Sequence, residues 1–293
     1  MPHFLENDLV KVQIDLPLES YQQPRFDWSG KISRMWYRGV PVIGREHLEE
    51  ERIELGGQGL CHEFGIEEAL GFEEAEIGEW FHKIGVGALK KTDDAYRFYD
   101  AFEVQAADFS VETADDSFRS VAIGPPIRGY AYRLEKEISL TENGLLIDYR
   151  LENTGERLIQ TQEYNHNFVA IADALMGPDY RLKFGFPIRQ AEIGEIVNPE
   201  SALFLGADHV GFRQTPPGQF FFGWVGGKQP VAASWSLEHA PSRLGIREIG
   251  NFPAVKVNLW GDRHVISPEL FAEVVVQPGE SQRWQRKYEV YAM

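Results

Sequence analysis

The sequence contains a single cysteine, Cys61, among its 293 residues. One cysteine cannot form a disulfide within the chain, which fits a reducing compartment. No apolar run approaches the roughly 18 residues that a membrane-spanning helix needs. The first residues, Met1 to Leu9, include Glu6 and Asp8 and lack the apolar core of a signal peptide. We therefore expect a soluble, cytoplasmic protein that does not contact membranes.

Basic residues are also scarce. The chain has 29 lysines and arginines against 45 aspartates and glutamates, for a net charge of -16. A nucleic-acid-binding surface needs clustered lysine and arginine to displace counterions, and no such cluster stands out. The composition therefore argues against a nucleic-acid partner. It leaves room for a small anionic ligand, because a single pocket can be locally basic.

The familiar catalytic and metal-binding signatures are missing. The eight histidines form no His-Glu-x-x-His pattern, and there is no Gly-x-Ser-x-Gly or Walker sequence. Cys61, His62 and Glu63 are adjacent, but zinc needs three or four convergent ligands, which sequence neighbours rarely provide. We expect no metal or other cofactor, and we expect Cys61 to be a small buried apolar residue.

Strand signals are abundant, and the clearest lie between residues 134 and 171. Segments 134–140 and 145–151 alternate in polarity around Asn143-Gly144, a dipeptide that favours a type I′ hairpin turn. A further turn at 153–155 leads into a third strand, 156–171, which together with the first two predicts a β-meander.

Helix signals are few, at 46–55 and more weakly at 67–75. Many strands separated by turns favour a sandwich or barrel. We therefore predict an all-β fold, one large antiparallel β-sandwich domain over residues 1–293 with few short helices. Further strands are expected at 31–37, 96–111, 219–225, 231–237, 254–259, 271–276 and 283–291.

A polar run, residues 164–168, interrupts the third of these central strands. It reads Tyr-Asn-His-Asn-Phe, although strands are poor in asparagine. Local rules are often broken where function requires it. Because residues two apart share a face of a strand, Tyr164, His166 and Phe168 lie on one side and Glu163, Asn165 and Asn167 on the other, so only one set should line a pocket; we expect it to be the set with His166. The asparagines between them should brace the backbone or nearby loops.

Three segments, in order along the chain, resemble the galactose mutarotase (aldose 1-epimerase) superfamily. Residues 81–87 look like its glycine-rich strand, 162–168 like its histidine strand, and 267–280 like its glutamate, "Pro-Gly-Glu" turn and closing strand. Two family features are not matched. The family arginine would fall near Lys90, and the second histidine has no clear counterpart, although His62 or His82 could substitute.

The resemblance implies a large β-sandwich that binds a free sugar and interconverts its α and β anomers without a cofactor. Such a reaction needs one base and one acid on either side of the hemiacetal. We expect Glu269 as the base and His166 as the acid. Expected substrate-binding residues are His62, Glu63, Lys83, Tyr164, Phe168 and Trp260.

Other functions remain open from the sequence. The same fold carries non-catalytic carbohydrate-binding proteins, phosphosugar mutarotases and polysaccharide lyases. The identity of the sugar and the oligomeric state do not follow from the residue pattern.

Overall fold

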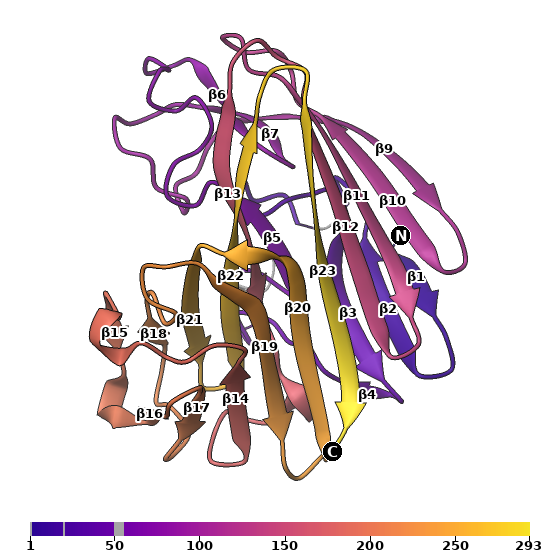
Figure 1. Cartoon of the computed structure of the whole chain (residues 1–293). Coiled ribbons are helices and arrows are strands. Elements are labelled where there is room, and N and C mark those ends of the chain that lie inside the picture. Colours follow the sequence, from indigo (N-terminus) through magenta and orange to yellow (C-terminus); the bar gives the residue numbers. More distant parts are fainter. Residues whose placement is uncertain (1, 20, 50–55) are drawn as a thin grey trace.

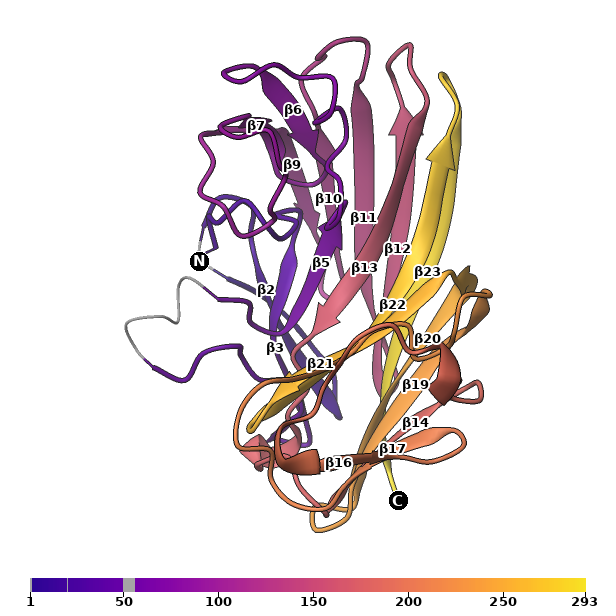
Figure 2. The same cartoon turned by 90° about the vertical axis from the view of Figure 1, so that its left-hand side faces the viewer.

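Two ten-stranded sheets dominate the molecule and lie face to face (Figure 1). We describe them from a computed structural model, which covers residues 2–19, 21–49 and 56–293. Seen from the side, β2, β3 and β5 form one layer, and β11, β12 and β23 form the other (Figure 2). The strand pairings are antiparallel. The predicted all-β antiparallel sandwich is confirmed.

The first sheet carries the polar run of the sequence on one of its central strands. Its strands, in spatial order, are β1 (His3–Glu6), β2 (Val10–Asp15), β3 (Lys31–Tyr37), β5 (Leu60–Phe64), β13 (Ile159–Asn167), β22 (Val265–Val276), β21 (Lys256–Asp262), β18 (Phe220–Phe222) and β15 (Ile196–Val197), with β4 (Val40–Pro41) paired to β3.

The second sheet backs the first. Its strands, in spatial order, are β16 (Leu203–Leu205), β17 (His209–Phe212), β14 (Tyr180–Phe184), β19 (Val231–His239), β20 (Leu244–Ala254), β23 (Ser281–Ala292), β12 (Gly144–Asn153), β11 (Tyr132–Thr141), β10 (Ser117–Ile123) and β9 (Asp108–Thr113).

A small third sheet and three short 3₁₀ helices complete the described elements. The sheet consists of β6 (Trp80–Lys83), β7 (Gly87–Lys90) and β8 (Val104–Ala106), and the helices are η2 (Ile171–Asp173), η3 (Gln190–Glu192) and η4 (Pro199–Ser201). No helix in the described part of the chain is long and apolar enough to cross a membrane.

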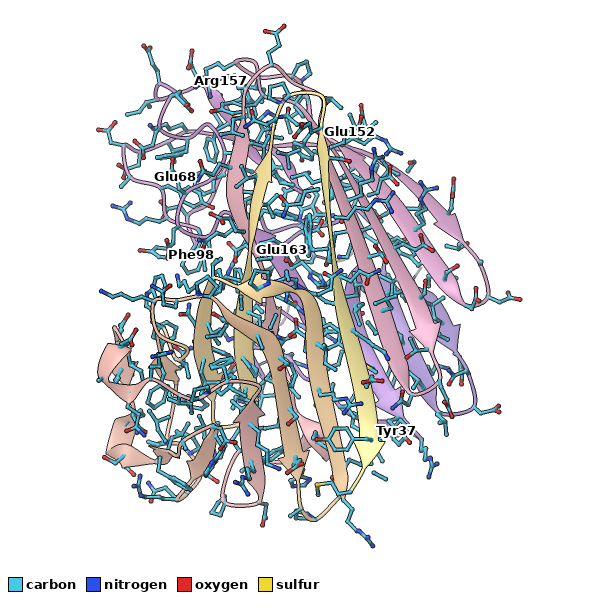
Figure 3. The ribbon with its side chains drawn as sticks, in the orientation of Figure 1. Tyr37, Glu68, Phe98, Glu152, Arg157 and Glu163 are labelled. Carbon is cyan, nitrogen blue, oxygen red and sulfur yellow. The ribbon has the colours of Figure 1, made fainter. Side chains whose placement is uncertain are left out.

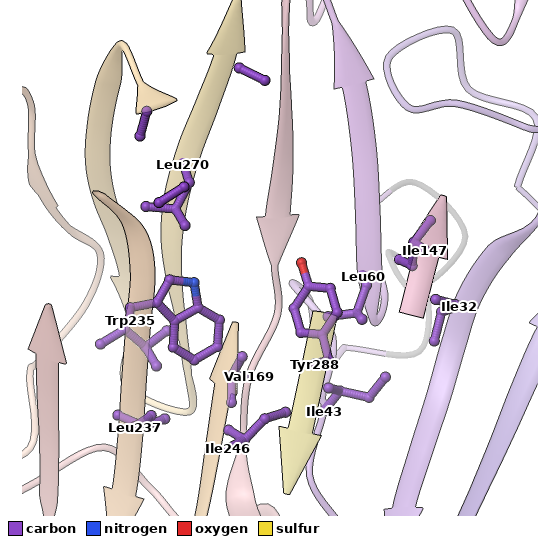
Figure 4. Close-up of a cluster of buried hydrophobic side chains, with 14 of the residues drawn as sticks. Ile32, Ile43, Leu60, Ile147, Val169, Trp235, Leu237, Ile246, Leu270 and Tyr288 are labelled. Carbon is purple, nitrogen blue, oxygen red and sulfur yellow. The ribbon is translucent and has the colours of Figure 1, made fainter. Parts of the chain in front are cut away.

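Aliphatic and aromatic side chains from both large sheets fill the space between them. Leu60 and Ile32 of the first sheet and Ile147 and Leu237 of the second are fully buried there (Figure 4). Each such side chain stabilises the fold by about 1.5–3 kcal/mol relative to an exposed one. This core comes from the alternating inward positions that the sequence pattern identifies.

The first sheet is also covered on its outer face. A second apolar cluster there includes Phe72, Phe81 and Phe168. Cys61 belongs to it and is buried, as expected, and burial raises the pKa of its thiol to about 11. Since β5 and the end of β13 are buried on both faces, polar groups on these strands need partners within the protein.

An ion cluster lies within the core, between the sheets. Arg286 of β23 donates to Glu163 of β13 at 2.7 Å and to Glu248 of β20 at 2.5 Å. The Trp284 indole donates to Glu163 at 3.0 Å, and the Asn167 amide donates to Glu248 at 3.1 Å. One buried guanidinium thus connects one strand of the first sheet to a strand of the second.

The predicted meander is wrong at its third strand. Strands β11 and β12 pair along their whole length, but β12 takes β23 as its other neighbour. Through residues 154–158 the chain crosses to the first sheet, where β13 pairs with β5 and β22. Alternation of polarity identifies a strand but does not identify its neighbours.

The turn between β11 and β12 also differs from the prediction. Thr141 pairs with Gly144, so the two turn residues are Glu142 and Asn143, and neither Asn143 nor Gly144 has a positive φ. The glycine serves packing instead, because a Cβ at Gly144 would lie 1.9 Å from the carbonyl oxygen of Tyr288 in β23.

Most other predicted strands are present with shifted ends, whereas the described residues of the two predicted helices are not helical. Segment 96–111 is not one strand but contains β8 from Val104 and β9 from Asp108, which belong to different sheets. Residues 67–75 form successive turns instead of a helix, with Gly71 at φ 79° and with Phe72 and Ala75 buried in the outer cluster. In the other predicted helix, 46–49 are irregular and 50–55 lie outside the described residues.

Candidate active site

The site lies where the hydrogen-bond ladder between β13 and β22 opens. The ladder runs as far as Glu163 opposite Ala272 and resumes as a single bridge between Val169 and Ile266. Pro268 of β22 has no N–H to offer β13, so a regular ladder cannot form at this point. The register is the same on either side of the opening, which sets His166 opposite Glu269.

Side chains connect the two strands across the opening. The backbone N–H of Asn167 donates to Ser267 Oγ at 2.9 Å, and its side-chain amide donates to the Pro268 carbonyl at 2.6 Å. Asn165 points to the same inner side and contacts Asn167 at 2.8 Å. The asparagines therefore hold the backbone from inside the sandwich, while His166 projects from the outer face.

His166 and Glu269 meet on that outer face. Nε2 of His166 lies 3.4 Å from Oε1 of Glu269, and the two residues are 3% and 4% exposed. Phe168 stacks on the imidazole with ring centroids 4.2 Å apart, and Trp260 approaches it edge-on at 5.0 Å. Four of the predicted site residues are thus brought together: His166, Glu269, Phe168 and Trp260.

Burial decides where the proton of this pair resides. It raises the pKa of Glu269 to about 7, despite the opposing charge of Arg25 and a hydrogen bond from Asn258. Burial, with Arg25, lowers the pKa of His166 well below its usual range. The favoured state near neutral pH is a neutral imidazole beside a carboxyl group that can hold a proton. The charged imidazolium that we expected for the acid is disfavoured.

Arg25 is the cation of this site, and the sequence reasoning missed it. Its Nε lies 3.0 Å from Glu63, its NH2 donates to the Tyr164 hydroxyl at 3.1 Å, and its guanidinium stacks on Phe98 at 4.4 Å. Lys90, where the family arginine was expected, is instead a partly exposed residue paired with the exposed Glu103. Arg25 precedes β13 by more than a hundred residues. The only signal near it in the sequence is the neighbouring aromatic residue Phe26, which is buried.

Glu63 organises the residues next to the pair. It accepts hydrogen bonds from Lys83 at 2.9 Å and from the Tyr164 hydroxyl at 2.6 Å, in addition to its contact with Arg25. The ammonium of Lys83 and the guanidinium of Arg25 lower the pKa of Glu63 although burial opposes them. Lys83 also donates to Tyr96 at 2.9 Å. The predicted residues Glu63, Lys83 and Tyr164 therefore form one charged cluster in which they bind one another.

The structure does not bring His62 to the site. Its side chain points into the sandwich, where Nδ1 lies 3.4 Å from Glu163 and the ring packs on Tyr149 at 5.3 Å. The reason is alternation, because His62 occupies the face of β5 opposite to that of Glu63. His82 is no substitute, since it contacts the Tyr130 carbonyl at 3.3 Å and burial lowers its pKa to about 4.

Two further residues at the site escaped the sequence reasoning. Asn258 of β21 is hydrogen-bonded to Glu269, and its Oδ1 accepts from the backbone N–H of Trp224 at 3.2 Å. Trp224 is half-buried and has φ 62°, a left-handed conformation that is unusual for a bulky residue. The alternation of Lys256, Asn258 and Trp260 along β21 could have revealed this polar face. Among the described residues, no group of three histidine, cysteine, aspartate or glutamate side chains could hold a metal ion.

Comparison with known proteins supports the fold assignment. No protein-family model matches the sequence, and no curated protein matches it either. Solved structures match over the whole chain. A galactose mutarotase-like protein from Lactobacillus casei ATCC 334 has a TM-score of 0.59 at 13% identity, covering 99% of this chain and 100% of that one.

Two more structures show the same likeness. A galactose mutarotase-like protein from Clostridium acetobutylicum has a TM-score of 0.59 at 11% identity, covering 99% of this chain and 95% of its own. A GalM/aldose epimerase homologue from C. elegans has a TM-score of 0.58 at 9% identity, with 100% of both chains covered. The chain therefore has the galactose mutarotase-like fold. At these identities the likeness establishes the fold and no more.

Proposed function

We propose that the protein is an aldose 1-epimerase-like enzyme that binds a free sugar and interconverts its anomers. The observation that carries this proposal is the His166–Glu269 pair. Its members lie 3.4 Å apart, and the pKa of Glu269 is close to 7. A general acid or base works best when its pKa is near the working pH. Trp260 beside the pair is half-buried and offers apolar surface for a sugar ring.

The reaction needs two proton transfers, one from Glu269 and one to His166. As the sugar enters, Glu269 donates its proton to the ring oxygen while His166 accepts the proton of the anomeric hydroxyl. The bond between the anomeric carbon and the ring oxygen breaks, and the aldehyde carbonyl forms. After rotation of the aldehyde, the ring oxygen attacks its other face, and both protons return. The sequence predicted Glu269 as the base and His166 as the acid. In this mechanism the proton lies on Glu269 before the reaction, so the two roles are exchanged.

Polarimetry on freshly dissolved α-glucose and α-galactose tests this proposal. Wild type should accelerate relaxation, and Glu269→Gln should abolish the acceleration, because the amide keeps the shape but cannot exchange a proton. Glu137→Gln serves as the matched control, since Glu137 is an exposed glutamate of β11. Since the active form holds one proton, acceleration should fall as pH rises through about 7. Equal acceleration by wild type and Glu269→Gln would refute the assignment of Glu269.

A non-catalytic sugar-binding protein is the second candidate. It is favoured by the direct contact between His166 and Glu269, because two groups bonded to each other can be purely structural. Sugar-induced thermal stabilisation without any acceleration of mutarotation would identify this function, since a ligand of the native state raises the melting temperature.

A further inference from the structure

A hollow of about 600 Å³ lies on the same face of the first sheet as the His166–Glu269 pair. Its floor is the start of β13, including Gln160 and Gln162, with Glu273 of β22 beside them. Its outer wall is the segment 65–71, which includes Glu68. Glu68 and Arg157, both of which line the hollow, are labelled in Figure 3. Ligand sites commonly have volumes of about 300–1,000 Å³.

The hollow and the pair belong to one strip of the sheet. On β13 and β22, Gln162 pairs with Glu273, and the Tyr164 and Phe271 rings stack next along the strands at 4.6 Å. His166 and Glu269 follow two residues further. A strand rises about 3.3 Å per residue, so Gln162 lies roughly 13 Å from His166. A ligand of more than one ring is needed to reach from one place to the other.

The lining of the hollow has the chemistry of a hydroxyl-binding site. The side chains of Gln160, Gln162, Glu68 and Glu273 make no hydrogen bond or ion pair with another residue in the part of the chain that the structure describes. Amides both donate and accept, and carboxylates accept, so together they suit sugar hydroxyls. Within the described ranges neither Glu68 nor Glu273 forms an ion pair, which disfavours phosphate and carboxylate groups near them.

The far end of the hollow is held by a wall of packed polar residues. Arg157 pairs with Glu74 at 2.9 Å and lies over the Tyr130 ring at 4.6 Å, while the Tyr130 hydroxyl donates to Glu74 at 3.0 Å. The one arginine of the hollow is therefore neutralised within it. A neutral or positively charged saccharide fits this balance better than an anionic one.

The ion pair of Lys256 and Glu67 lies between the hollow and the His166–Glu269 pair. Lys256 lies over the Phe271 ring at 4.7 Å and contacts Glu67, whose side chain is 68% exposed. Glu67 also lines the hollow. Pairs with an exposed member are weak, so an incoming ligand can displace Glu67 at little cost.

From these observations we infer that the hollow is a second sugar subsite, and that the substrate is a neutral oligosaccharide with a free reducing end. Its reducing ring lies at His166 and Glu269, and its chain passes the Lys256–Glu67 ion pair, which covers the buried Phe271 ring, into the hollow. This inference rests on the proposed function for the position of the reducing ring. It adds the size and charge class of the substrate.

Isothermal titration calorimetry tests the inference without requiring catalysis. The probes are glucose, galactose, mannose and N-acetylglucosamine, each with its neutral reducing di- and trisaccharides. Wild type should bind at least one trisaccharide about tenfold more tightly than its monosaccharide, as expected for one or two added hydrogen bonds. The double variant Gln162→Ala, Glu273→Ala should lose this gain and keep its monosaccharide affinity. Glu137→Ala, on the exposed face of β11, is the control.

The outcomes separate this inference from the proposed function. A chain-length gain that the double variant removes supports the subsite, even if polarimetry shows no mutarotation. Equal affinity for monosaccharide and trisaccharide throughout the panel overturns it, even if mutarotation is found. A gain that survives in the double variant also overturns it, because the added rings then bind elsewhere.

Discussion

Replacing Glu269 by glutamine should make the protein more stable in alkaline solution. The pKa of Glu269 is raised from 4.5 to about 7, chiefly by burial. A raised pKa means that the native state holds the proton more tightly than the unfolded chain does. The resulting stability is complete below pH 4.5 and is lost as pH rises through 7. A shift of this size corresponds to about 3 kcal/mol, and glutamine, which never ionises, avoids that loss.

Urea denaturation of wild type and Glu269→Gln between pH 4 and pH 8.5 measures the effect. The two proteins should have similar free energies of unfolding at pH 4, and the variant should gain progressively, by up to about 3 kcal/mol at pH 8.5. Glu273→Gln, an exposed glutamate on the same strand, should show no such gain. A difference that does not vary with pH, or a variant that is less stable at pH 8.5, would refute a raised pKa at Glu269.

Three further perturbations test other parts of the structure. Arg25→Met should raise the pKa of Glu269, because the guanidinium opposes the effect of burial. The alkaline limb of the pH–rate profile should therefore move to higher pH, and a limb that stays in place would exclude this coupling. Gly144→Ala should cost about 1–3 kcal/mol in urea denaturation by overpacking against β23, whereas Gly218→Ala, with open space around it, should change stability by less than about 0.5 kcal/mol; equal costs would contradict the packing argument. Cys61 should resist a thiol reagent at pH 8 in the native protein and react once in denaturant, since burial raises its pKa to about 11; rapid native labelling would show that it is accessible.

The sequence predicted strands well where one face is buried and the other wet. In β12, for example, residues alternate between buried and half-buried positions along the strand after its first two residues. It predicted the wrong partner for β13, because polarity shows which way a side chain points and says nothing of which strand lies alongside. The 67–75 helix failed because the apolar side chains Phe72 and Ala75 are buried by a chain of turns, with Gly71 in a left-handed conformation.

The candidate site could be predicted in part. His166 and Glu269 stand in recognisable segments, and strand alternation alone separates Tyr164 from the asparagines. Arg25 could not be found, because it reaches Tyr164 from 139 residues away, and no local pattern reports a contact of that kind. His62 was misplaced because it was assigned to the same pocket as its neighbour Glu63, although adjacent residues of a strand point to opposite faces.

The ion cluster of Arg286 has a consequence for how the chain settles into its fold. In most strands a slip of one residue is prevented because it would turn apolar side chains to water. That protection is weak in β13, where Glu163, Tyr164, Asn165 and His166 place polar groups on both faces. In β13 the ion pair between Glu163 and Arg286 fixes the register instead. A slip of one residue would move Glu163 away and leave the buried guanidinium of Arg286 without this partner. Arg286, which lies on the opposite sheet and contacts neither His166 nor Glu269, therefore helps to fix the position of His166 opposite Glu269.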